Sequence, residues 1–306
     1  MVNRKLIVTI AIVSASFIVA LAYIQTLALA NERSLSQATV LCTPQRFTGT
    51  LEAKSAYVFD ISSNTLLYEK NAYQQMPLAS LTKLMTVLVA SRHIKSNDRI
   101  VITKEALSPE GDAGLFEGEV WHAQDLIDYT LITSANDGAH ALALATPTSP
   151  ETKNFTEAMN ATAREIGLTQ TYFLNDTGLD VSTSTGGAYG SAHDIAQLLN
   201  FIYHNASTVF DGSAQKKRVF TSVSGFTHDA SHTSSVTGLL QGEALAKTGF
   251  TDLAGGNLGV IAEPILGHVV AIVVLQSSRE GRDTDVAHLY EFARSAIKHS
   301  ELCKQL

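Results

Sequence analysis

The amino-acid sequence predicts an α+β fold, in which strands from both ends of the chain form one antiparallel sheet and helices pack against it. Five strand-like runs lie near the two ends of the chain: 55–61, 65–68, 244–252, 256–262 and 268–276. Short turns join neighbouring runs, and strands joined in this way pair antiparallel. The long stretch between the two groups of strands is mostly helical in pattern.

Helical periodicity supports this division of the chain. The run 81–94 is apolar nearly all round, which predicts a buried helix. Further helical patterns cover residues 124–145, 151–166, 192–203 and 286–299. A short strand is expected at 99–103, and the segment 176–190, rich in Gly, Ser and Thr, is expected to be a loop.

The first thirty residues have the composition of a signal peptide or a membrane anchor. Arg4 and Lys5 precede the almost wholly apolar stretch 6–24, and basic residues in this position direct the following chain out of the cytoplasm. The small-x-small triplet at 28–30 would allow cleavage. A span needs about 20 apolar residues, so the length of the run favours an uncleaved anchor.

The chain therefore has three expected parts. Residues 1–30 are a signal peptide or an N-terminal membrane anchor, residues 31–52 are a polar linker, and residues 53–300 are an extracytoplasmic domain that is secreted or anchored to the cytoplasmic membrane. In such a compartment Cys42 and Cys303 could form a disulfide or remain two thiols, and the sequence leaves both possibilities open.

Composition excludes several classes of protein. A net charge of −7 argues against a nucleic-acid partner, which requires a basic face. The two cysteines form no C-x-x-C pair, so a cysteine zinc site or redox motif is excluded. His228 and His232 could suggest a metal hydrolase, but we expect exposed histidines in a Ser/Thr-rich loop, and the chain has no H-E-x-x-H helix. We expect no metal and no cofactor.

Ser80 and Lys83 form the first candidate catalytic pair. They stand three residues apart at the start of the predicted buried helix and so share a helix face. The free N–H groups at a helix start favour developing negative charge, which suits a serine nucleophile with a lysine base. Ser-x-x-Lys also occurs at 213–216, before a charged cluster, and at 295–298, too late in the chain for the elements that follow.

Two further elements follow in order along the chain. Ser134 and Asn136 interrupt an apolar helical pattern, and polar side chains that are buried need partners. Lys247, Thr248 and Gly249 lie in a predicted strand, where a glycine permits close approach of a ligand. Each element alone is typical of ordinary structure. In the order Ser-x-x-Lys, Ser-x-Asn, Lys-Thr-Gly they form the set associated with penicillin-binding proteins and class A β-lactamases.

Residues 53–298 resemble low-molecular-mass penicillin-binding proteins of the D-alanyl-D-alanine carboxypeptidase family, serine peptidase family S11. Beyond the three motifs, the resemblance includes the segments 77–86, 134–139, 173–180, 191–194 and 247–255. It implies a β-lactamase/transpeptidase-like fold, an antiparallel sheet flanked by helices with a helical subdomain and the site in the cleft. It also implies a location in the bacterial periplasm or on the cell-wall side of the membrane.

The resemblance implies a serine-type carboxypeptidase that acts on peptidoglycan stem peptides and is inhibited by β-lactams. Ser80 would attack the peptide carbonyl between two D-alanines and form an acyl-enzyme, and Lys83 would take its proton. Ser134 would relay protons with Lys83, and Asn136 would hold the peptide carbonyl of the substrate.

The third motif is implied to bind substrate. Lys247 would keep the site positive and Thr248 would bind the terminal carboxylate, with Gly249 beside them. The N–H groups of Ser80 and Phe250 would form the oxyanion hole. A lysine base must be neutral to accept a proton, and we expect burial and the nearby charge of Lys247 to lower the pKa of the base.

Three alternative functions stay open. The segment 236–240 lacks an arginine that some carboxypeptidases carry there, and neither Arg279 nor Arg282 can be assigned to the substrate carboxylate, which leaves D,D-endopeptidase action on cross-linked stems. A class A-like β-lactamase would need a glutamate acting through water, and Glu165 is the lookalike. A non-catalytic peptidoglycan-binding homologue would have kept every catalytic residue by accident. The family's larger members also carry a C-terminal β-rich domain and a membrane-binding tail, and we expect neither here.

Overall fold

The computed structural model describes residues 15–32, 42–111, 113–148 and 152–305. Residues Arg46–Ile297 form one compact unit. The described parts of Met1–Gln45 and Lys298–Leu306 form a second, much smaller unit.

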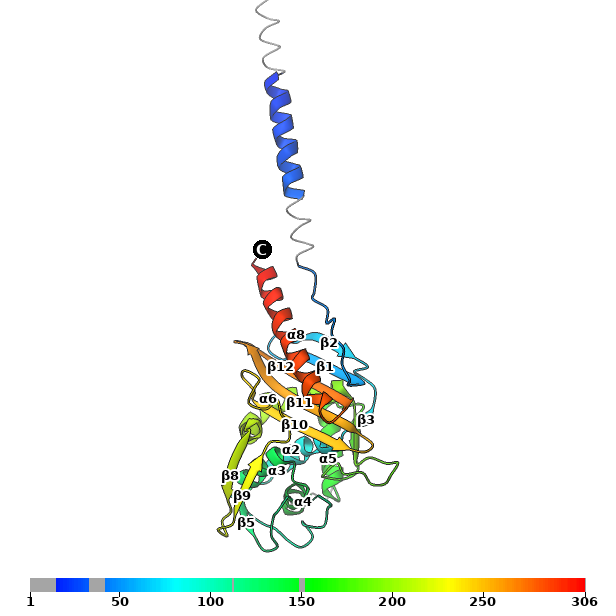
Figure 1. Cartoon of the computed structure of the whole chain (residues 1–306), viewed down its shortest axis with the longest axis vertical. Helices are drawn as coiled ribbons and strands as arrows, with labels where there is room; N and C mark the ends of the chain where they lie inside the picture. Colours follow the sequence, from blue (N-terminus) through cyan, green and yellow to red (C-terminus); the bar gives the residue numbers. More distant parts are fainter. Residues whose placement is uncertain (1–14, 33–41, 112, 149–151, 306) are drawn as a thin grey trace, which may run out of the picture. The chain divides into compact units, whose positions relative to one another are not determined.

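A five-stranded antiparallel sheet lies at the centre of the larger unit (Figure 1). Its strands are β1 (Ser55–Asp60), β2 (Thr65–Lys70), β10 (Leu245–Thr251), β11 (Gly255–Ile265) and β12 (His268–Ser277). Their order across the sheet is β10-β11-β12-β1-β2, and every neighbouring pair is antiparallel. Since β1 pairs with β12, the two ends of the chain build one sheet, which confirms the predicted α+β class.

Helices cover both faces of this sheet. Successive residues of a strand point to opposite sides, so one strand can contribute apolar side chains to the helices on both faces. The covering helices are α2 (Thr82–Ser91), α6 (Ala192–Asn205) and α8 (Gly281–Lys304). In β1, Ala56 and Val58 belong to the apolar cluster that includes α8. Tyr57 and Phe59 belong to the larger cluster that includes α2 and α6. Strand β1 is therefore buried on both faces.

The middle of the chain is helical, with short strands between the helices. The helices are η1 (Ala79–Leu81), α3 (Ala123–Thr133), α4 (Asn136–Ala145), α5 (Phe155–Ile166), α7 (Ser207–Phe210) and η2 (Asp211–Ala214). Three small sheets consist of β3 (Met76–Pro77), β6 (Tyr172–Phe173) and β7 (Ala188–Gly190); of β4 (Arg99–Val101) and β5 (Val120–His122); and of β8 (Lys217–Thr221) and β9 (Thr227–Ser231).

Two expectations for this region are wrong. The helix expected over 124–145 is divided into α3 and α4, because Ser134 adopts a left-handed conformation with φ 64°. The histidine segment is not an exposed loop. His228 lies in β9, is buried, and contacts Glu119 at 2.7 Å (Nε2 to Oε1), while His232 is half-buried and contacts the carbonyl of Ala246 at 3.3 Å. The β8–β9 hairpin packs one side inward, which the polar composition concealed.

Near the N-terminus, the helix Ala15–Glu32 is long and apolar enough to cross a membrane, a property that signal sequences share. The remainder of the apolar stretch expected at 6–24 lies outside the described residues, as do residues 33–41 of the expected linker. Cys42 and Cys303 form a disulfide with their Cα atoms 5.4 Å apart, so the structure favours pairing over two free thiols.

Asp285 fastens α8 to two other segments of the domain. Its carboxylate accepts hydrogen bonds from the N–H groups of Glu52 (3.0 Å) and Ala53 (2.8 Å) and from the hydroxyl of Ser277 (2.8 Å). The carboxylate is almost fully buried. It therefore joins the entry to β1, the end of β12 and the start of α8.

We predict that Asp285→Ala lowers the free energy of unfolding by about 3 kcal/mol, because three donors lose their acceptor in or near the core. Urea denaturation of the full chain measures this change. Asp229→Ala, at an exposed position of β9, is the matched control and should change stability by less than about 0.5 kcal/mol. Equal losses in the two variants would contradict the assigned role of Asp285.

Candidate active site

Ser80 lies in η1, the tight turn immediately before α2. The preceding residue, Ala79, has a left-handed conformation with φ 49°, which is costly for a residue other than glycine. Two glycines allow neighbouring segments to approach this turn. A Cβ on Gly249 would lie 2.7 Å from the carbonyl oxygen of Leu78, and one on Gly178 would collide with the carbonyl of Ala79.

Asn257 of β11 fixes the chain that leads into this turn. Its Nδ2 donates to the carbonyls of Pro77 (3.0 Å) and Leu78 (3.1 Å), while its Oδ1 accepts from the N–H of Gln276 (2.8 Å). This amide is fully buried. The candidate nucleophile is thereby held against the end of the central sheet.

Lys83 follows one turn later and is fully buried. Its Nζ donates to Ser80 Oγ (2.9 Å), Asn136 Oδ1 (2.7 Å) and the carbonyl of Thr177 (2.8 Å). An ammonium has three N–H donors, so all three are used. The acceptors come from the turn before α2, the start of α4 and the segment after β6, which therefore converge on a single nitrogen.

Burial lowers the pKa of Lys83 from 10.5 to about 7, although the carboxylates of Asp176 and Asp137 oppose the shift. Lys83 is therefore partly neutral at neutral pH. A neutral amine keeps two N–H donors, enough for Asn136 and Thr177, and its lone pair can then face the hydroxyl of Ser80. Burial acts as expected, but the expected contribution from Lys247 is not among the causes of this shift.

Lys247 is a second fully buried lysine in the site. Its Nζ donates to Ser134 Oγ (2.8 Å) and to the carbonyl of Thr248 (2.8 Å). Burial, followed by the charges of Lys83 and Arg282, lowers its pKa well below the ordinary value. The positive charge of Lys83 therefore helps to lower the pKa of Lys247.

Ser134 and Asn136 take different partners. Ser134 was expected to exchange protons with Lys83, but its hydroxyl contacts Lys247 instead. The left-handed turn at Ser134 ends α3 and places Asn136, the first residue of α4, at Lys83. The Nδ2 of Asn136 donates to the carbonyl of Glu110 (2.7 Å), which fixes the orientation of the amide and leaves one N–H.

Strand β10 brings the third motif to the same place. The hydroxyl of Thr248 is in contact with that of Thr233. The carbonyl of Gly249 accepts from Nη1 of Arg282 (2.9 Å), whose Nη2 donates to the carbonyl of Thr233 (3.1 Å). A Cβ on Gly249 would lie 3.2 Å from the backbone nitrogen of Ser80. The backbone of the nucleophile and that of β10 are therefore in close contact, as an oxyanion hole formed by Ser80 and Phe250 requires.

Two cavities lie at β10 or at residues that contact it. One, of about 800 Å³, is lined by residues that include Thr233, Arg279 and Arg282. The other, of about 700 Å³, is lined by residues that include Phe250 and Asp180. The guanidinium of Arg279 lies 3.9 Å from the centre of the Phe250 ring. There is thus space for a ligand beside the third motif.

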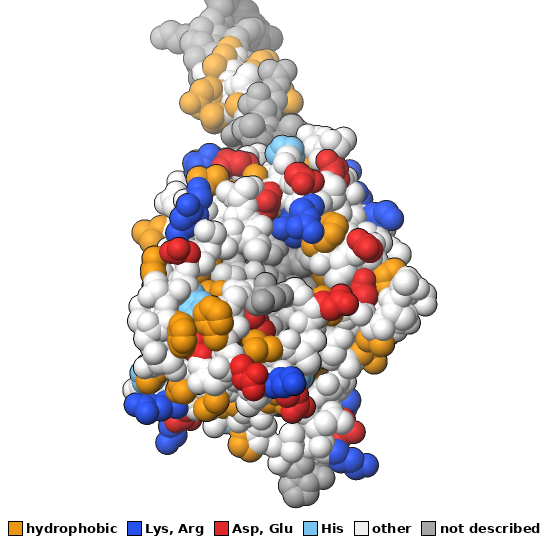
Figure 2. All heavy atoms as spheres, turned by 60° about the horizontal axis from the view of Figure 1, so that its bottom comes forward, with side chains coloured by type: hydrophobic (Ala, Val, Ile, Leu, Met, Phe, Trp, Pro, Cys, Tyr) orange, Lys and Arg blue, Asp and Glu red, His pale blue; other side chains and the backbone are white. Residues whose placement is uncertain are grey.

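Charges of both signs are mixed over the surface. Figure 2 shows Lys and Arg side chains interspersed with Asp and Glu on the face turned forward, and the described side chains form no broad basic area there. Such an area is what a nucleic-acid partner would need. Within the described residues, no group of three or more His, Cys, Asp and Glu side chains could hold a metal ion.

The structure brings the residues of the three motifs to one site, and it adds others. Thr177 contributes a backbone carbonyl, which leaves no mark in a sequence. Asn257 could have been recognised as a polar residue inside an apolar strand, whereas Arg282 was considered but lies in a polar segment that does not reveal its partner. Glu165, the lookalike for a β-lactamase glutamate, is exposed and forms a surface ion pair with Arg92 (2.7 Å).

Comparisons with known proteins agree with this geometry. A family model described as D-alanyl-D-alanine carboxypeptidase matches residues 41–278. The chain is 29% identical over 261 residues to the D-alanyl-D-alanine carboxypeptidase DacF of Bacillus subtilis, covering 83% of this chain and 65% of that protein. It is 28% identical over 259 residues to DacD of Escherichia coli, covering 80% and 63%. The chain therefore spans just under two thirds of the length of these two relatives.

Solved structures show the same similarity. Penicillin-binding protein D2 of Listeria monocytogenes, in its cefotaxime-bound form, superposes with a TM-score of 0.69 at 27% identity. The match covers 81% of this chain and 99% of the Listeria chain. The sheet and helices of the larger unit are thus those of a penicillin-binding fold.

We predict that the rate of acylation of Ser80 by a penicillin rises with pH, with a midpoint at about 7. Lys83 can accept a proton only when neutral, and it is neutral above its pKa, so activity is lost as the pH falls through that value. Stopped-flow measurement of the second-order rate constant between about pH 5 and 9 provides the test. Lys83→Met should abolish the reaction. A rate that does not depend on pH would show that Lys83 is not the base.

Proposed function

The chain belongs to the D-alanyl-D-alanine carboxypeptidase family of serine peptidases, and on this premise we propose that it removes the terminal D-alanine from peptidoglycan stem peptides. The observation that carries the proposal is the contact of 2.9 Å between Ser80 Oγ and Lys83 Nζ, with Lys83 buried and its pKa lowered to about 7. A serine beside a neutral lysine is an activated nucleophile.

Acylation starts with the transfer of the Ser80 proton to Lys83 as Oγ attacks the carbonyl carbon between the two D-alanines. The N–H groups of Ser80 and Phe250 stabilise the negative charge on the carbonyl oxygen. The C–N bond then breaks, and the leaving amine takes a proton from Ser134. Lys247, which donates to the Ser134 hydroxyl at 2.8 Å, restores that proton.

Deacylation reverses these roles with water as the nucleophile. Before this step the Lys83 ammonium releases the proton that it took from Ser80 and Lys247 regains one, so that both lysines return to their starting states. Water then transfers a proton to Lys83 and attacks the ester carbonyl, and Lys83 passes this proton to Ser80 Oγ as the ester bond breaks and the carboxylic acid product forms. The enzyme is then ready for another stem peptide. These steps use the side chains of the three motifs together with the N–H groups of Ser80 and Phe250.

Two side chains of the site bind the substrate by donating hydrogen bonds to it. The second N–H of Asn136 Nδ2 holds the peptide carbonyl of the stem, and the hydroxyl of Thr248 donates to the terminal carboxylate. A carboxylate that arrives beside Lys247 raises the pKa of this lysine, because opposite charges stabilise one another. Lys247 is therefore protonated when substrate is bound, although burial lowers its pKa in the free enzyme.

A β-lactam resembles the D-alanyl-D-alanine terminus and acylates the same serine. Water is hindered from attacking the ester of the ring-opened acyl group, so this group stays attached to Ser80. We therefore assign β-lactams as covalent inhibitors, in keeping with the cefotaxime-bound form of the Listeria relative.

The location of the protein is proposed to be outside the cytoplasm. The disulfide between Cys42 and Cys303 suits an oxidising compartment, and the apolar helix Ala15–Glu32 suits export or anchoring. We assign residues 1–30 to a signal peptide or anchor, 31–52 to a linker and 53–300 to the catalytic domain.

A second candidate activity is D,D-endopeptidase cleavage of cross-linked stems. The similarity to the D-alanyl-D-alanine endopeptidase of Pseudomonas aeruginosa, 31% identical over 155 residues and 49% of this chain, favours it. Mass analysis of products from cross-linked and uncross-linked peptidoglycan separates the two activities. Release of free D-alanine from pentapeptides supports the carboxypeptidase, and loss of cross-linked dimers without free D-alanine supports the endopeptidase.

We predict that Ser80→Ala abolishes both D-alanine release and the mass increase caused by penicillin, because the attacking oxygen is gone. Intact-protein mass spectrometry and D-alanine detection measure the two effects. Ser213→Ala is the matched control, since Ser213 begins another Ser-x-x-Lys sequence and its buried hydroxyl has no hydrogen-bond partner in the structure. A penicillin adduct that persists in Ser80→Ala would disprove the assignment of the nucleophile.

A further inference from the structure

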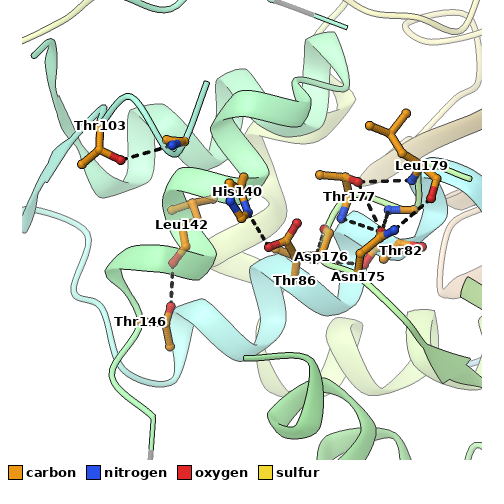
Figure 3. Close-up of polar contacts among 12 residues, drawn as sticks. Thr82, Thr86, Thr103, His140, Leu142, Thr146, Asn175, Asp176, Thr177 and Leu179 are labelled. Atoms are coloured by element: carbon orange, nitrogen blue, oxygen red, sulfur yellow. Dashed lines mark hydrogen bonds and ion pairs between the residues drawn. The ribbon is translucent and has the colours of Figure 1, made fainter. Parts of the chain in front are cut away.

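His140 and Asp176 form a contact that the proposed reaction does not use. His140 lies in α4, and its Nδ1 is 2.7 Å from Oδ2 of Asp176, in the segment after β6 (Figure 3). The side chains are 22% and 14% exposed, so the pair is largely shielded from solvent. A contact of this length and burial is strengthened when the histidine carries a proton.

Asp176 is held on the face of α2 that carries the base. Its backbone carbonyl accepts from the hydroxyl of Thr86 (2.6 Å), one helical turn after Lys83 (Figure 3). The carbonyl of the next residue, Thr177, accepts from Lys83 Nζ (2.8 Å). The segment that contacts the ammonium of Lys83 therefore also carries the carboxylate of Asp176.

From this arrangement we propose that His140 is a positioning residue. Its positive charge pairs with the carboxylate of Asp176 and thereby keeps the amine of Lys83 uncharged at neutral pH. The inference rests on the proposed function of Lys83 as the base for Ser80. Asp176 alone would stabilise a proton on Lys83. With His140 charged, the carboxylate has another counter-ion, and the proton resides on the histidine instead.

The surrounding charges favour a proton on His140 and a neutral Lys83. The hydrogen bond to Asp176 raises the pKa of His140, burial opposes this shift, and the charges of Asp176 and Glu105 add to it. Asp176 and Asp137 both raise the pKa of Lys83 against the effect of burial. On its other side Lys83 faces Lys247, whose own pKa is lowered by the repulsion. Asp176 is therefore a carboxylate shared by His140 and Lys83, and it raises the pKa of both groups.

Two substitutions should move the pH dependence of acylation in opposite directions. His140→Gln keeps an N–H donor for Asp176 but removes the positive charge, so Lys83 should hold its proton more tightly and the midpoint should rise by about half a pH unit or more. Asp176→Asn removes the negative charge, so the midpoint should fall by a similar amount. The double variant should resemble Asp176→Asn, because His140 acts mainly through the carboxylate.

The experiment measures the second-order rate constant of penicillin acylation against pH for the full chain in a mild detergent. His268→Gln is the matched control, because His268 contacts Asp60 with the same atoms at the same 2.7 Å at the far end of β12. Its midpoint should equal that of the wild type. Thermal unfolding of each variant verifies that it is folded.

The outcomes separate this inference from the function on which it rests. Acylation of the wild type that depends on Ser80 supports the proposed function by itself. Opposite shifts in His140→Gln and Asp176→Asn support the role of His140. Unchanged midpoints, or shifts in the same direction, would overturn it, and a lower plateau rate with an unmoved midpoint would show that the pair is only structural.

Discussion

The burial of the Lys83 amino group is the constraint on which the rest of the site depends. A lysine with no exposed surface must satisfy each N–H within the protein, and its three acceptors come from three separate segments: η1, α4 and the turn after β6. Those segments cannot move apart without leaving the ammonium unpaired. The left-handed turns at Ala79 and Ser134 are the conformations that let the chain bring these acceptors to one point.

The same burial links structure to chemistry. Burial lowers the pKa of Lys83, so a fraction of the amine is neutral at neutral pH. Because Lys83 contacts Ser80, this neutral amine can accept the serine proton. Lys247 is just as buried but contacts Ser134. In the function proposed above, one buried lysine therefore serves the serine nucleophile and the other serves the donor to the leaving group.

Much of this arrangement could be predicted from the sequence, because side-chain chemistry and order along the chain carry the information. Three short motifs indicate Ser80, Lys83, Asn136 and Lys247, and strand-like runs joined by short turns indicate all five strands of the central sheet. The contact of Ser134 with Lys247 could not be predicted, since the sequence does not reveal that a left-handed residue turns the helix there. The carbonyl of Thr177 has no side-chain signature, and the short β8–β9 hairpin was concealed by its polar composition.

The most direct test is the protonation state of Lys83 itself. The full chain can be labelled with ¹³C at Cε of lysine, and the Lys83 signal, assigned by its loss in Lys83→Met, can be followed against pH by NMR. The buried site predicts a midpoint at about 7. A midpoint close to the ordinary value of 10.5 would show that Lys83 is charged at neutral pH and would contradict its role as the base.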